Sequence, residues 1–160
     1  MTLNYLHNAY LGELYGIRFF TTFIEQYSDP HHNNKWQALL DIEIITAKKL
    51  KTALIPLGIA CPDYDQKMTQ QGIEDANKWL HLPWITLIDT MVAWVAPYQQ
   101  RYQQQAKNAQ QHQEIFNLIA DHENAIYDFL VAEQAKSTES LQILQHFIDS
   151  HTKQQNDAFL

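Results

Sequence analysis

Apolar residues recur every three or four positions along most of this chain, which is the spacing of helices that bury one face. The pattern predicts five long helices, over about residues 4–27, 34–57, 83–108 and 111–133, and from a cap at Ser137 or Thr138 onward. We therefore expect an all-α protein with one apolar stripe on each helix.

Proline and glycine mark where these helices end. Pro30 ends the first helix, because proline disfavours helical backbone in the residue before it. Gly58 is placed to end the second helix, and Asn33 or Asn34 can cap its start. Pro97 lies inside the third helix and predicts a kink there. Because only four glycines and five prolines occur in 160 residues, we expect a few long elements.

The connection between the second and third helices covers residues 59–81, and a short helix is expected in it near 65–71 or 73–80. A link of this length fits a crossover along a helical bundle, which would bring the third helix parallel to the second. The chain length suits a single domain over residues 1–160. We therefore expect a four-helix bundle with a long crossover between helices two and three and an additional C-terminal helix.

Two glycines, Gly12 and Gly16, lie four residues apart on one face of the first predicted helix. Glycine lowers helix stability, so the pair suggests that another helix approaches the backbone closely at this face. We interpret the pair as a packing feature rather than as part of a ligand site.

Composition restricts the classes of function. The formal net charge is −7 and there is no run of lysine and arginine, so nucleic-acid binding is not expected. Cys61 is the only cysteine, which rules out an internal disulfide and a CxxC motif. No stretch has the pattern of a membrane helix or of a signal peptide. We therefore expect a cytoplasmic protein without a membrane partner.

Four acidic residues interrupt the apolar stripes, one on each of the first four helices: Glu13, Glu43, Asp89 and Glu123. A buried carboxylate is costly unless it has a cation, a basic partner or a hydrogen-bond network. The first two residues belong to one predicted hairpin and the last two to the next, so a crossover would bring all four to one level of the bundle. Carboxylates that converge from four helices are how a bundle core binds metal ions.

The chain resembles the ferritin-like proteins over most of its length. The segments that carry the resemblance are Gly12-Glu13-Leu14-Tyr15-Gly16, Leu40-Asp41-Ile42-Glu43, and Asp121-His122-Glu123 with Phe129. The chain is most similar to an uncharacterised bacterial branch of that superfamily. Members with metal commonly hold a di-iron centre, activate oxygen or peroxide, or store iron. The resemblance implies metal-ligand roles for Glu13, Glu43, Asp89 and Glu123.

The chain departs from the metal-binding members at several positions. Those members have a histidine three residues after the ligand glutamate on helices two and four, whereas Thr46 and Ile126 stand there in this chain. Neither side chain replaces an imidazole. His122 precedes Glu123 directly and points about 100° away from it around the helix, so it is an outside candidate for a ligand. The acid on the third helix is shortened to Asp89.

Three hypotheses about function follow, and the sequence does not specify a reaction or decide whether the protein is an enzyme. The favoured one is a non-catalytic bundle with a vestigial site, acting through binding or self-association, for example as a homodimer. The first alternative is a non-heme di-iron or manganese oxidoreductase that uses the four carboxylates and, tentatively, His122. The second alternative is a small-molecule binder with a cavity between helices.

Overall fold

The computed structural model describes residues 2–157, and in this part of the chain all regular structure is helical. The chain divides into two compact units, Met1–His81 and Leu82–Leu160. The helices of the first unit are α1 (Thr2–Gln26), α2 (Asn33–Leu54) and α3 (Gln66–Trp79), with short 3-10 turns at Pro30–His32 and Ile55–Leu57. Those of the second unit are α4 (Trp84–Asn108), α5 (Gln113–Gln134) and α6 (Ser140–Asp157).

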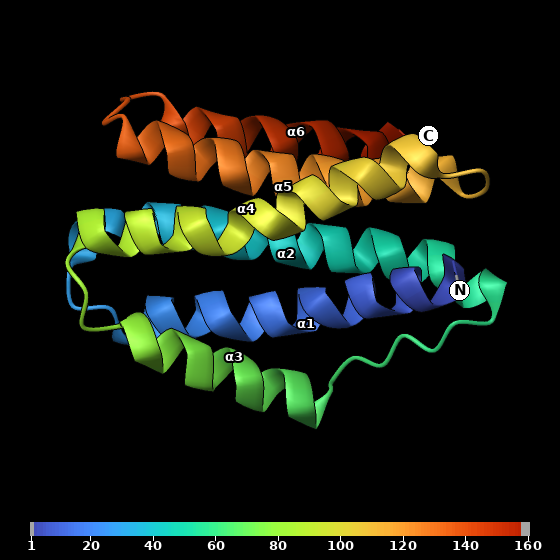
Figure 1. The fold of residues 1–160 in the computed structure, drawn as a ribbon, viewed down its shortest axis with the longest axis horizontal. Helices are drawn as coiled ribbons and strands as arrows, with labels where there is room; N and C mark the ends of the chain where they lie inside the picture. The colour runs from blue at the N-terminus through green and yellow to red at the C-terminus, as the bar shows by residue number, and fades with distance from the viewer. Residues whose placement is uncertain (1, 158–160) are drawn as a thin grey trace. The chain divides into compact units, whose positions relative to one another are not determined.

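In the first unit, α1 packs against both α2 and α3 (Figure 1). An aromatic cluster forms the core at one end of this unit. The ring of Phe23 stacks on Trp36 with centroids 4.4 Å apart, and Phe19 meets Trp79 edge to face at 6.0 Å. Burial of large aromatic side chains contributes most of the packing energy here. The aromatic contacts therefore fix α2 and α3 on α1.

Gly72 lets α3 approach α1 closely. A β-carbon at this position would lie 2.8 Å from the carbonyl oxygen of Tyr15 and 3.2 Å from the backbone nitrogen of Phe19. The Tyr15 hydroxyl donates a hydrogen bond of 2.7 Å to Asp75, and Lys78 bonds the same carboxylate at 3.0 Å. The short helix expected in the connection is confirmed, and it is a 14-residue helix that spans both of the positions considered for it.

A glycine turn, two side-chain contacts and a helix cap fix the connection between α2 and α3. Gly58 ends the helical segment with a φ of +80°, a left-handed conformation that glycine adopts without strain, as predicted. The hydroxyl of Tyr10 donates a hydrogen bond of 2.6 Å to the carbonyl of Pro62, and Lys51 forms a short ion pair with Asp63. Asp65 caps α3 by accepting the backbone N–H of Met68 at 2.9 Å.

In the second unit, α5 packs against both α4 and α6 (Figure 1). The α4 helix continues through Pro97, and Figure 1 shows it bending midway along its length. In the second half of α4, Gln99 and Gln103 donate hydrogen bonds of 2.9 and 3.2 Å to the side-chain oxygen of Asn124. The helix predicted over residues 83–108 is confirmed, and it ends at Asn108.

The turn between α5 and α6 contains a buried polar pair. The Ser140 hydroxyl donates a hydrogen bond of 3.1 Å to the carboxylate of Glu133, and both residues are buried. Leu144 and Phe147 are the buried apolar residues of α6. The fifth predicted helix is thus confirmed, and it begins at Ser140.

Two detailed predictions are wrong, one about the cap of α2 and one about packing at Gly12. The 3-10 turn Pro30–His32 leads directly into α2, so His32 is the N-cap residue. Its side chain makes no capping hydrogen bond, and neither Asn33 nor Asn34 is the cap. Gly12 is exposed, and no described atom lies within 4 Å of where its β-carbon would be. The close approach expected at both glycines therefore occurs at Gly16 alone.

Candidate metal site

Glu13 lies on the buried face of α1. Glu13 follows Tyr10 by one helical turn and precedes Gly16 by another, so all three residues lie on one face of α1. Only 4% of Glu13 is exposed. The prediction that this acid interrupts the apolar stripe is confirmed.

Glu43 occupies the equivalent place on α2, where it is 5% exposed between the buried residues Leu39 and Ala47. Its carboxylate lies against the backbone of Gly16. A β-carbon on Gly16 would be 2.5 Å from both Cδ and Oε1 of Glu43. Real β-carbons do not approach other atoms this closely, so the space that Glu43 occupies exists because residue 16 has no side chain.

The carboxylates of Glu13 and Glu43 face each other across the interface of α1 and α2. One oxygen of each lies within 4.8 Å of the other. Oxygen ligands bind divalent cations at about 2.0–2.6 Å, so one ion placed between these oxygens could bond both. Two like charges at this distance in a buried position repel each other, and a cation between them would offset the repulsion.

Asp89 does not share this environment, and the expectation that it faces inward is wrong. It is exposed, and its carboxylate accepts a hydrogen bond of 2.9 Å from Gln134 on α5. The face of α4 that is buried carries Leu87, Ile88, Met91 and Val95. Ile85, one helical turn before Asp89 on the same face, is 46% exposed.

On α5 the adjacent pair His122 and Glu123 is oriented differently from the prediction. His122 is 2% exposed, whereas the side chain of Glu123 is 18% exposed. The Nδ1 atom of His122 lies 4.0 Å from a carboxylate oxygen of Glu123. The His122 ring also meets Phe147 of α6, with centroids 6.3 Å apart. His122 is thus the more deeply buried of the two, and the metal-ligand roles expected for both remain predictions.

The positions where the resemblance leads one to expect histidine are also buried. Thr46 is 0% exposed on α2 and Ile126 is 4% exposed on α5.

Arg18, one possible basic partner for the acids, forms an ion pair of 3.5 Å with Glu25. Arg101, the other, lies over the ring of Tyr98 at 5.3 Å from its centroid.

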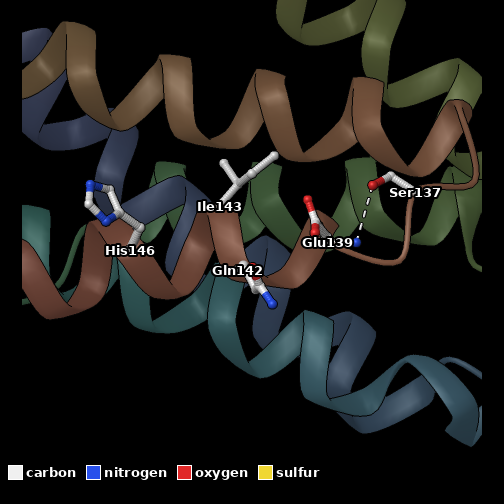
Figure 2. A pocket seen from close by; sticks show the side chains of 5 residues that line it. All are labelled: Ser137, Glu139, Gln142, Ile143 and His146. Atoms are coloured by element: carbon white, nitrogen blue, oxygen red, sulfur yellow. Dashed lines mark hydrogen bonds between the residues drawn. The ribbon is translucent and has the colours of Figure 1, made fainter.

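A separate pocket of about 380 Å³ lies at the start of α6, lined by Ser137, Glu139, Gln142, Ile143 and His146. Figure 2 shows these side chains along the first turns of α6 and the turn before it, with the Glu139 N–H bonded to the Ser137 hydroxyl at 3.1 Å. Ile143 is half-buried and the other four residues are exposed. The pocket is therefore open to solvent and holds no buried polar group.

Comparison with protein-family models, with curated proteins and with solved structures found no match to this chain. In the described residues, no helix combines the length and the apolar character needed to cross a membrane.

Proposed function

We propose that this protein binds a divalent transition-metal ion, iron or manganese, through the carboxylates of Glu13 and Glu43. The observation that carries the proposal is the buried position of both groups with oxygens within 4.8 Å of one another. Gly16 supports it, because the absence of a side chain there leaves room for the Glu43 carboxylate.

The chemistry of the two donors fits such an ion. Carboxylate oxygens are hard ligands that suit manganese and ferrous iron, and a divalent charge offsets both negative charges at once. Bound iron or manganese would supply redox or Lewis-acid chemistry. The two glutamates would hold the ion, and the apolar residues around them would limit the access of water.

The proposal includes the architecture that the sequence resemblance implies. In it, α1, α2, α4 and α5 are the four helices of a ferritin-like bundle and α6 is the additional helix. The resemblance would extend the ligand set to Glu123, with His122 as the alternative ligand from the same helix. Asp89 is left out, since it is exposed and bonded to Gln134.

Elemental analysis by inductively coupled plasma mass spectrometry tests the proposal on the purified, untagged protein. Stoichiometric iron or manganese is expected in the unmodified chain and should be lost in Glu13→Gln and Glu43→Gln. Glu25→Gln is the matched control, because Glu25 lies on α1 with its side chain 51% exposed. Unchanged metal content in both buried variants would refute the assignment of these ligands. The same measurement on His122→Gln tests the role predicted for that residue.

A second candidate function is a non-catalytic bundle that acts by self-association, for example as a homodimer. The exposure of Asp89, and the presence of Thr46 and Ile126 where metal-binding ferritin-like proteins have histidine, favour it. It predicts no bound metal after anaerobic reconstitution, together with a stability of Glu13→Gln equal to or above that of the unmodified protein. Sedimentation equilibrium would then establish the oligomeric state.

A further inference from the structure

The hydroxyl group of Thr46 is a buried polar group in an unusual position. Thr46 is 0% exposed, and its Oγ1 atom has no hydrogen-bond partner among the described residues. It lies on α2 three residues after Glu43, which is one helical turn further along the same buried face. A buried hydroxyl without a partner loses its hydration with no compensation.

Four other helical threonines bond their hydroxyls within their own helix. The hydroxyls of Thr21, Thr22, Thr52 and Thr90 each donate to the carbonyl oxygen four residues earlier, at 2.6–3.1 Å. Thr22 is the closest comparison, since it is also 0% exposed. The Thr46 hydroxyl does not use the equivalent bond to its own helix, although this bond is readily available to a helical threonine.

Thr46 is the neighbour of Glu43 on the buried face of α2. Side chains on a helix lean toward its N-terminus and cover the preceding turn. The preceding turn of α2 carries Glu43. The side chain of Thr46 is therefore expected to cover the part of the α2 surface from which the Glu43 side chain projects.

We propose that Thr46 is a positioning residue whose hydroxyl donates a hydrogen bond to a water or hydroxide bound to the metal ion at Glu13 and Glu43. This inference rests on the proposed metal-binding function. Two carboxylates leave much of the coordination sphere of manganese or iron to other ligands, and water commonly completes it. A hydrogen bond from the protein to such a ligand orients it and strengthens metal binding.

Three variants of the full chain test the role of Thr46. Thr46→Val keeps the shape and removes the hydroxyl, Thr46→Ser keeps the hydroxyl, and Thr22→Val is the matched control at a buried threonine whose hydroxyl is bonded. Urea unfolding of the metal-free proteins measures stability, and isothermal titration with Mn²⁺ measures affinity. Loss of a hydrogen bond to a metal ligand commonly weakens binding by about tenfold or more.

We expect Thr46→Val to bind Mn²⁺ about tenfold more weakly and, without metal, to unfold at the same or a higher urea concentration. Thr46→Ser should restore the affinity. Thr22→Val should lower the urea midpoint and leave the affinity unchanged, because it removes a bond made within the protein. Unchanged affinity in Thr46→Val, or a loss of metal-free stability equal to that of Thr22→Val, would overturn the inference while the metal-binding function stands. No Mn²⁺ binding by the unmodified chain would instead overturn the proposed function and this inference with it.

Discussion

Gly16 on α1 lies so close to the carboxylate of Glu43 on α2 that a β-carbon there would approach it to 2.5 Å. The contact joins a residue without a side chain to a buried acid. It makes Gly16 part of the proposed site, although glycine itself offers no ligand.

The Gly16→Ala variant should therefore separate metal binding from folding. The added methyl group displaces the end of the flexible Glu43 side chain, while alanine gains about 1 kcal/mol of helix propensity over glycine. We expect the free energy of unfolding to change by less than about 1 kcal/mol and the affinity for Mn²⁺ to fall at least about tenfold.

Gly12→Ala provides the control on the same helix, because Gly12 is exposed and no described atom is near its β-carbon position. It should raise the stability by up to about 1 kcal/mol and leave the metal affinity as it is. Equal metal affinity in the two alanine variants would show that Glu43 does not need the space beside Gly16.

A different outcome is expected for Gly72→Ala, because the two atoms nearest to its β-carbon belong to the backbone of α1. Backbone cannot move aside as a side-chain end can, so α3 must shift away from Tyr15 and Phe19. We expect a destabilisation of about 1–3 kcal/mol in urea unfolding. Hydrogen exchange should be faster in α3. Unchanged stability and exchange would mean that the α1–α3 contact is looser than the structure shows.

Cys61 is expected to react slowly while the protein is folded. Burial raises the pKa of its thiol, and the charge of Lys51 opposes this only in part. Because the reactive species is the thiolate, alkylation by iodoacetamide at pH 8 should be slower in the folded protein than in urea.

The raised pKa of Cys61 also makes the stability of the folded protein depend on pH. Since the folded pKa of Cys61 is the higher one, its contribution to stability is present below the ordinary value of 9.0 and is lost as the pH rises through the raised value. Cys61→Ala removes that contribution, and urea titrations between pH 8 and pH 10 measure the difference. Equal alkylation rates in the folded and unfolded protein would contradict the burial of this thiol.

The burial of two of the four acids could be predicted from the sequence. The positions of Glu13 and Glu43 followed from helical spacing, and both are buried as predicted. The α4 helix has apolar residues around more than half of its circumference. Two stripes were therefore possible, and the packing against α5 buries the one with Ile88, which leaves Asp89 outside.

The other differences arise from contacts that a one-dimensional pattern does not contain. His122 is buried where Glu123 was expected, so α5 is rotated about its axis by one residue, or about 100°, relative to the prediction. The role of Gly72 depends on where α3 packs against α1. The missing hydrogen bond of the Thr46 hydroxyl is visible only in the three-dimensional structure. The ferritin-like arrangement and the metal-ligand roles remain predictions.

The contact between Gly16 and Glu43 also limits how this sequence can diverge. A larger residue at position 16 is compatible with the same helix packing only if the Glu43 carboxylate leaves its present position or the two helices move apart. Among descendants of this chain, glycine at 16 should therefore persist wherever glutamate at 43 persists, and the two should be lost together. Such paired inheritance would distinguish an acid retained for binding from one that is merely tolerated in the core.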